Sequence, residues 1–188
     1  MDKNSIKSPT KLAVGISLII LGIVLFFGRN KTVEILASSF ENEPVKIEGL
    51  NLEPEEGEDI PEKIIIPSLS IDLPVKEAKV VNGYWEVFSD SAGWGEGSGN
   101  LGKPGNQVIF AHARQGLFLP LRSIEVGDMV YVLSEDKYFS YSVQDIKEVV
   151  PGQTEVIAPT EDETLTLYTC SGFADSKRLI VIAKRQVE

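Results

Sequence analysis

The pattern of hydrophobic and polar positions divides the 188-residue chain into three zones. Residues 12–28 form an uncharged apolar run with basic residues on both sides. Residues 32–63 carry many acidic side chains and three prolines, a composition typical of an extended, self-repelling linker. From Ile64 onward, short apolar runs alternate with turn residues. The pattern therefore predicts a membrane anchor in residues 1–31, an acidic linker in 32–63 and one folded domain in 64–188.

The apolar run 12–28 is long enough to cross a bilayer as a helix. Its 17 residues would extend about 25 Å, and the flanking basic side chains can reach outward to the lipid headgroups. A cleaved signal peptide with a cut site at Ala37-Ser38-Ser39 is the alternative, but the run is longer than the apolar part of a typical signal peptide. We therefore expect an uncleaved, single-pass anchor. Three basic residues precede the run and two follow it, so the charges alone barely decide its orientation.

Runs rich in Val, Ile, Tyr and Thr fill the third zone and predict β-strands. Asn82-Gly83 lies between two of these runs and is typical of a two-residue hairpin turn. Only Leu117–Ile124 has the pattern of one or two short helical turns. Many short strands separated by turns favour an all-β barrel or sandwich. The predicted strands are Ile64–Pro67, Ile71–Val75, Ala78–Val81, Tyr84–Val87, Gln107–His112, Met129–Leu133, Tyr138–Val149, Thr164–Thr169 and Leu179–Ala183.

Three further stretches suggest ligands but lack the pattern that a ligand site needs. The glycine-rich stretch 93–99 precedes a strand instead of a helix and has no following Lys-Ser or Lys-Thr, so it does not match a phosphate-binding loop. We expect it to be a mobile loop beside the site, with Trp94 packing or contacting substrate. The acidic clusters 55–59 and 161–163 lack the spacing of a calcium-binding loop. We predict no required metal and no cofactor.

Three chemically distinctive side chains lie at the ends of predicted strands. Cys170 is the chain's single cysteine and His112 its single histidine, and Arg178 opens the last apolar run. Acyl transfer through a thioester needs a thiol nucleophile, a group that moves protons and a cation for the developing oxyanion. With one histidine in the chain, any imidazole base must be His112.

A purely structural interpretation of these residues is also open. Cysteine is often buried as a small apolar side chain, and a lone histidine is usually a satisfied polar group. Arg178 has other basic residues near it, at Lys177, Lys184 and Arg185, which would suit a basic edge strand. Strand ends favour the catalytic interpretation, because side chains converge on clefts there.

The run Thr166-Leu167-Tyr168-Thr169-Cys170 resembles the TLxTC signature of sortases, the cysteine transpeptidases of bacterial surfaces. The resemblance covers about Ile64 to Ala183, with Ala111 at a position where the family often has glycine. Three other stretches are similar to family segments in the expected order: 66–75 to the opening strand pair, 105–112 to the histidine strand, and 118–124 with 126–128 to the short helix and turn after it.

The resemblance implies an eight-stranded barrel with the active site at one mouth. It further implies Cys170 as the nucleophile that carries the acyl group, His112 as the proton donor and acceptor, and Arg178 as the oxyanion or substrate-positioning group. The implied partners are surface proteins that bear an LPxTG-like sorting signal and an amine acceptor in the cell envelope. The N-terminus would be cytoplasmic and the catalytic domain would lie outside the membrane. The short loop 171–177 resembles that of the class D and E sortases.

Composition is compatible with this interpretation and leaves two alternatives. The net charge of −10 argues against a nucleic-acid partner, and 43% hydrophobic residues suffice for one core. A single cysteine excludes an internal disulfide, so its thiol in an extracytoplasmic domain suggests chemistry. The alternatives are a membrane-anchored cysteine protease, in which water resolves the thioester, and an inactive surface-binding barrel.

Overall fold

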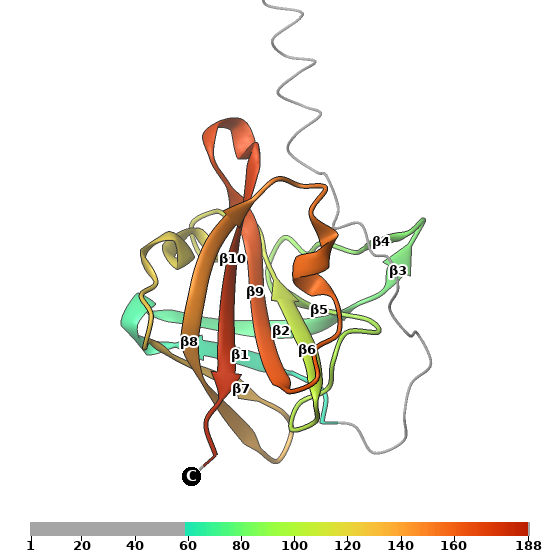
Figure 1. Ribbon diagram of the computed structural model, residues 1–188, viewed down its shortest axis with the longest axis vertical. Helices are drawn as coiled ribbons and strands as arrows, with labels where there is room; N and C mark the ends of the chain where they lie inside the picture. Colours follow the sequence, from blue (N-terminus) through green and yellow to red (C-terminus); the bar gives the residue numbers. More distant parts are fainter. Residues whose placement is uncertain (1–58, 188) are drawn as a thin grey trace, which may run out of the picture. The chain divides into compact units, whose positions relative to one another are not determined.

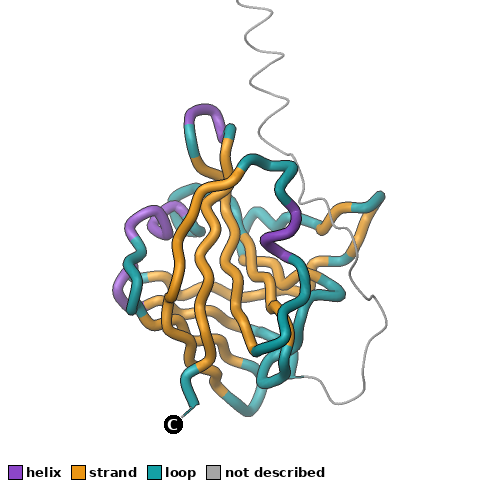
Figure 2. Tube along the Cα trace, in the orientation of Figure 1, coloured by secondary structure: helices purple, strands orange, loops and turns teal. Residues whose placement is uncertain are grey.

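The computed structural model describes residues 59–187, which form a β-barrel with one small hairpin outside it (Figure 1; Figure 2). The predicted all-β fold of eight barrel strands is confirmed. The strands are β1 Lys63–Ile66, β2 Ile71–Ala78, β3 Val80–Val81, β4 Tyr84–Trp85, β5 Ala92–Gly95, β6 Gly105–Phe110, β7 Met129–Leu133, β8 Tyr138–Val149, β9 Glu163–Ser171 and β10 Lys177–Arg185. Four short 3₁₀ helices connect them within the described residues: η1 Pro67–Leu69, η2 Leu119–Ser123, η3 Thr154–Ile157 and η4 Phe173–Asp175.

The barrel closes in the order β1-β2-β5-β6-β9-β10-β8-β7, with β7 returning to pair with β1. Two of its neighbouring pairs are parallel, β2 with β5 and β6 with β9. The other six pairs are antiparallel. Full closure leaves no barrel strand with an unpaired edge, which is the main physical benefit of this architecture.

Strands β6, β9 and β10 are buried on both faces, which explains why they read as nearly continuous apolar runs. Leu165 and Leu167 of β9 point into the barrel interior and belong to the main core. Tyr168, on the other face of β9, packs in a second apolar cluster outside the barrel wall with Trp85 and Ile157. The outer cluster therefore joins the barrel to the β3–β4 hairpin and to η3.

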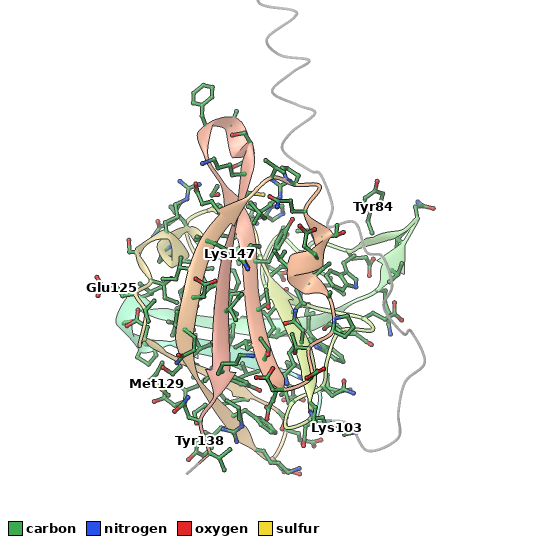
Figure 3. All side chains as sticks on the ribbon, viewed as in Figure 1. Tyr84, Lys103, Glu125, Met129, Tyr138 and Lys147 are labelled. Atoms are coloured by element: carbon green, nitrogen blue, oxygen red, sulfur yellow. The ribbon has the colours of Figure 1, made fainter. Side chains whose placement is uncertain are left out.

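The hairpin predicted at Asn82-Gly83 is present as β3 and β4. Both turn residues have positive φ, 53° and 83°, as a type I′ turn requires. The hairpin lies outside the barrel wall, and Figure 3 labels Tyr84 on it. Trp85 points back from the hairpin and is 1% exposed, so the hairpin is fastened to the barrel by one large buried ring.

The glycine-rich stretch 93–99, predicted as a loop, begins instead within a barrel strand, β5, so that prediction is wrong for residues 93–95. β5 pairs with β2 on one side and β6 on the other. Trp94 is buried in the main core, and its indole N–H donates to the carbonyl of Gly99 at 3.2 Å. The glycines are there because aromatic rings lie against the strand: a Cβ on Gly95 would come within 2.4 Å of the Trp85 ring.

The helical prediction holds at Leu117–Ile124, where η2 forms, but the described residues contain three more short 3₁₀ helices than that stretch accounts for. None of the helices in residues 59–187 is long and apolar enough to span a bilayer. The predicted membrane helix at 12–28 lies outside the described residues, as does most of the predicted linker.

The last residues of the predicted linker contact the barrel. The Glu62 amide donates to the Leu133 carbonyl at 2.8 Å, and the Glu62 carbonyl accepts from the Val75 amide at 2.8 Å. Asp59 accepts a bond of 2.7 Å from the Lys137 ammonium. The contacts of the folded domain therefore begin before Ile64.

Candidate active site

The ends of β6 and β9 lie side by side, and this places His112 next to Cys170. The two strands are parallel, with Phe110 opposite Tyr168. Beyond that pair the contact continues for one more residue, since the Ala111 amide donates to the Tyr168 carbonyl at 3.3 Å. Extending the same register by two residues from Phe110 and Tyr168 sets His112 beside Cys170, and residues in register on parallel strands point to the same side.

Thr169 ties these two strand ends together. Its hydroxyl, 1% exposed, donates to the Ala111 carbonyl at 2.7 Å. This bond joins the residue before the cysteine to the residue before the histidine. Thr169 therefore orders the site.

Arg178 lies on the other side of the cysteine strand, directly opposite Cys170 in the antiparallel pair of β9 and β10. Cross-strand partners project to the same face of a sheet. The side chain is 3% exposed, and its Nη1 donates to the carbonyls of Asp175 at 2.7 Å and Lys177 at 3.0 Å. These bonds fasten the β9–β10 loop, which Figure 1 shows projecting beyond the end of the barrel.

The alternative in which Arg178 belongs to a basic edge strand is wrong. β10 is paired on both sides, with β9 and with β8, and Arg178 lies opposite Cys170 on one and Val149 on the other. A buried guanidinium requires a structural or chemical reason, because burying a charge is costly unless it is well hydrogen-bonded. The position of Arg178 beside the Cys170 thiol gives an electrostatic reason, because a neighbouring cation favours the thiolate.

His112 is half-buried in the loop that follows β6. Its carbonyl accepts bonds from the amides of Arg114 at 2.9 Å and Phe118 at 3.0 Å, which fold the loop back on itself. Burial lowers the pKa of His112 below its ordinary value of 6.5, the positive charge of Arg114 lowers it further, and the carboxylate of Asp175 opposes both effects. The imidazole therefore loses its proton more readily than a solvated histidine.

Cys170 is also half-buried, unlike its neighbours on both sides along β9, Thr169 and Ser171, which are buried. The thiol is thus at the rim of the outer apolar cluster and not inside it. Half-burial of the thiol and of the imidazole argues against the interpretation of both as inert core residues. The three predicted site residues are therefore brought to adjoining ends of β6, β9 and β10.

Asn106 holds the segment that covers the outer side of these strands, a contact the sequence did not reveal. The Asn106 amide nitrogen donates to the carbonyls of Val156 at 3.2 Å and Ala158 at 3.0 Å, on either side of Ile157. Its amide oxygen accepts a bond of 2.7 Å from Thr166. A polar side chain within an apolar strand was the one available signal, because such a buried group must find partners.

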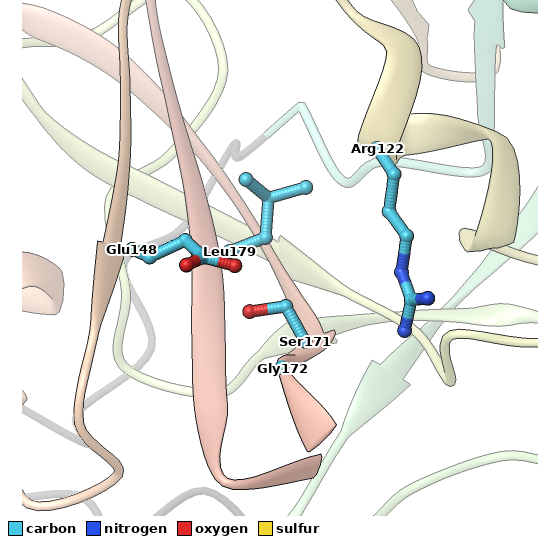
Figure 4. A pocket seen from close by; sticks show the side chains of 5 residues that line it. All are labelled: Arg122, Glu148, Ser171, Gly172 and Leu179. Carbon is cyan, nitrogen blue, oxygen red and sulfur yellow. The ribbon is translucent and has the colours of Figure 1, made fainter. Parts of the chain in front are cut away.

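A pocket lies on the other side of β9, immediately after the cysteine (Figure 4). Its volume is about 300 Å³. Its lining residues come from four separate parts of the chain, so no local sequence motif predicts the pocket. They are Arg122, Glu148, Ser171, Gly172 and Leu179.

Replacing Arg178 with alanine is expected to slow peptide cleavage by about 10²-fold, the usual cost of removing one oxyanion-stabilising donor. It should also lower the melting temperature, because the carbonyls of Asp175 and Lys177 lose their buried partner. Steady-state kinetics and thermal unfolding would measure the two effects.

The control for this variant is Lys184→Ala, which removes a more exposed cation from the far end of the same strand. Lys184 pairs with Asp162 at 2.8 Å on the surface, so its loss should change stability by less than about 1 kcal/mol and leave cleavage unaltered. Equal kinetic losses in the two variants would refute a specific role for Arg178.

The fold and the site together define a closed barrel that presents a cysteine, a histidine and an arginine at adjoining strand ends. A family model described as a sortase domain matches residues 64–186. Since that match covers well over half of the chain, the chain belongs to the sortase family.

Named relatives agree with the family. The chain is 29% identical over 126 residues to Sortase A of Bacillus anthracis, covering 64% of this chain and 57% of that one. It is 31% identical over 129 residues to Sortase A of Streptococcus agalactiae, covering 64% and 51%. The structure matches that of sortase C from Clostridium perfringens with a TM-score of 0.56 and 27% identity, covering 71% of this chain and 73% of that one.

The chain spans little more than half the length of the curated relatives that it matches. Those relatives carry the name sortase A, and the matching Clostridium perfringens structure carries the name sortase C. The likeness to class D and E in the loop after the cysteine therefore stays a prediction.

Proposed function

We propose that the chain is a cysteine transpeptidase that cleaves an LPxTG-like sorting signal after threonine and transfers the acyl group to an amine. The observation that carries the proposal is the parallel register of β6 and β9, which brings His112 beside Cys170 while Arg178 faces the same thiol from β10. We further propose that residues 12–28 anchor the enzyme in the cell membrane with the barrel outside, on the strength of the uncharged apolar run.

The first half of the reaction forms a thioester. The Cys170 thiolate attacks the threonine carbonyl, and Arg178 stabilises the negative oxygen or aligns the peptide. The C–N bond then breaks, and the imidazolium of His112 gives its proton to the departing amine. The second half reverses the roles: an incoming amine attacks the thioester, His112 accepts a proton from it, and the thiolate leaves.

The fraction of enzyme in the reactive form is small at neutral pH. With ordinary pKa values, only about 1% of molecules at pH 7 hold a thiolate together with an imidazolium. The lowered pKa of His112 reduces the imidazolium further. The cation of Arg178 acts in the other direction by favouring the thiolate, which is a physical reason for a buried arginine at this position.

The test of reaction type is to supply a cleavable sorting peptide with and without an amine acceptor. We expect ligated product to increase at the expense of hydrolysed product as the amine concentration rises, because a positioned amine resolves a thioester faster than water does. Mass spectrometry of the products measures the ratio, with Cys170→Ala as the blank.

Hydrolysis that stays constant with every acceptor would contradict transpeptidation. The chain would then be a membrane-anchored cysteine protease that uses the same thioester. Absence of any thioester, together with a thiol that resists labelling at neutral pH, would instead support the inactive binding barrel.

A further inference from the structure

The axial alignment of the parallel strands β6 and β9 sets the distance between His112 and Cys170. Figure 1 shows the two strands side by side, and their pairing spans all of β6, from Gly105 to Phe110. A strand is nearly extended, so a displacement along its axis is carried to its far end. A slide of β6 against β9 at the end away from the site therefore moves the imidazole past the thiol.

Both strands carry polar side chains that are buried. Asn106 is 3% exposed, Gln107 is fully buried, and Thr166 is 1% exposed. A buried polar group is costly unless it is hydrogen-bonded, and replacing a bonded pair with apolar groups of the same shape is often nearly neutral. Stability alone therefore gives little reason for polar residues at these positions, whereas the direction of their hydrogen bonds gives one.

On the outer face of the pair, one side-chain bond crosses between the strands diagonally. Asn106 lies opposite Thr164 in the register. Its amide oxygen, however, accepts a bond of 2.7 Å from the hydroxyl of Thr166, two residues further along β9. A bond perpendicular to two strands hardly changes length in a small slide, whereas a diagonal bond changes length at once. The Asn106–Thr166 bond, here called the outer brace, stretches when β9 slides towards its C-terminal end.

On the inner face, a second connection runs diagonally in the opposite direction. Gln107 lies opposite Leu165 in the register. Its amide oxygen is 2.6 Å from the Tyr141 hydroxyl, which is 2.7 Å from a carboxylate oxygen of Glu163, two residues back along β9. Burial raises the pKa of Tyr141 above its usual value, so the hydroxyl keeps the proton that the two acceptors share. This connection, the inner brace, stretches when β9 slides the other way.

We propose that Asn106 and Gln107 are positioning residues for the reaction, because the two opposed braces hold β6 in axial alignment with β9 and so keep the imidazole beside the thiol. The inference rests on the proposed transpeptidase function, since it names the groups that hold its two reacting side chains in place. Asn106 comes six positions before His112, about 20 Å along an extended strand, so it acts through the strand and not by touching substrate.

Thr166→Val tests the outer brace, because it keeps the shape of the side chain and removes the hydroxyl that donates to Asn106. We expect kcat for cleavage of a sorting peptide by the full chain to fall about tenfold, with KM changed less than about twofold, since misplacing the reacting groups slows chemistry more than it weakens binding. Thr166→Ser keeps the hydroxyl and should restore kcat to within about threefold of the wild-type value.

Thr164→Val is the matched control, on the same strand and face and 2% exposed. The Thr164 hydroxyl donates to the Asp162 carbonyl at 3.2 Å and accepts from the Lys184 ammonium at 2.6 Å. These bonds lead to the turn before β9 and to β10, instead of to β6. The same substitution should therefore lower the melting temperature as Thr166→Val does, but leave kcat within about twofold.

Tyr141→Phe tests the inner brace independently, because it removes only the hydroxyl that joins Gln107 to Glu163. We again expect a fall of about tenfold in kcat with little change in KM. If Thr166→Val does not fold, this variant decides the question by itself, and an unchanged kcat would overturn the inference.

A second measurement does not depend on turnover. The chain has one cysteine and one histidine, so alkylation of Cys170 with iodoacetamide, followed by NMR of His112, reports the coupling of the two groups. Alkylation should lower the pKa of His112, because it removes the thiolate charge that favours the imidazolium. That change should shrink at least about twofold in Thr166→Val and persist in Thr164→Val.

The outcomes separate this inference from the proposed function. Equal losses of kcat and of coupling in Thr166→Val and Thr164→Val, or no loss in either, would overturn the braces while leaving transpeptidation intact. Coupling that is lost in Thr166→Val alone, in a chain that never transfers an acyl group to an amine, would support the braces and overturn the proposed function instead.

Discussion

Cys170→Ala is expected to abolish cleavage of a sorting peptide, with a loss of about 10⁴-fold or more in turnover, because no other thiol exists in the chain to form the thioester. The mass of the acyl-enzyme adduct should disappear with the activity. Cys170 is half-buried, and its replacement removes one atom at the rim of the outer cluster, so the melting temperature should change little. Mass spectrometry of protein incubated with peptide, beside thermal unfolding, measures both effects.

Cys170→Ser is the matched control for this prediction, since it keeps the shape and replaces only sulfur. Serine should fail almost as completely, because its hydroxyl needs a strong base to become nucleophilic, whereas a cysteine beside Arg178 does not. An active serine variant would mean that the nucleophile is not what we propose. An unfolded alanine variant would favour a structural role for the cysteine.

His112→Ala should cost about 10³-fold in turnover, the usual contribution of a positioned acid–base group. Because the chain has one histidine, the imidazole signal in a proton NMR titration belongs to His112 without assignment. That titration should give a pKa below 6.5, since burial and Arg114 both disfavour the imidazolium. A His112→Ala variant with unchanged turnover would exclude it as the proton shuttle.

Two neighbouring variants test the sign of each electrostatic effect on His112. Arg114→Gln removes a repulsive cation and should raise the pKa, so a larger share of imidazolium persists at pH 7. Asp175→Asn removes an attractive carboxylate and should lower it. Shifts of the same sign in both variants would contradict this account of the site.

Most strands were predictable from local pattern, and the one strand of the described residues that was missed, β5, has a physical reason. The Asn82-Gly83 hairpin and the strand that ends at Cys170 follow from residues close together in the chain. β5 was missed because a strand containing two glycines has little apolar pattern of its own. Glycine is required there because the rings of Trp85 and Phe110 leave no room for a Cβ, and those two rings come from other segments of the chain.

In the candidate site, too, some features follow from local sequence and others only from contacts between distant segments. Residue type, position at strand ends and the resemblance to the sortase signature mark Cys170, His112 and Arg178 as candidates in the sequence. The pocket of Arg122, Glu148 and Ser171 has no such signal, because each of its charged residues is an ordinary surface residue in its own segment. Only their convergence distinguishes them.

The sequence by itself determined the all-β class, the presence of one thiol and one imidazole, and the motif that ends in Cys170, since periodicity, turn residues and composition are local properties. The tertiary structure decided that β6 runs parallel to β9 and that β10 pairs on both sides. Parallel pairing and barrel closure depend on contacts between segments that are distant in the chain. The packing of two buried faces sets the register of these strands, so the sequence of either strand alone does not predict it. That register is what turns two strand ends, far apart in the chain, into a single site.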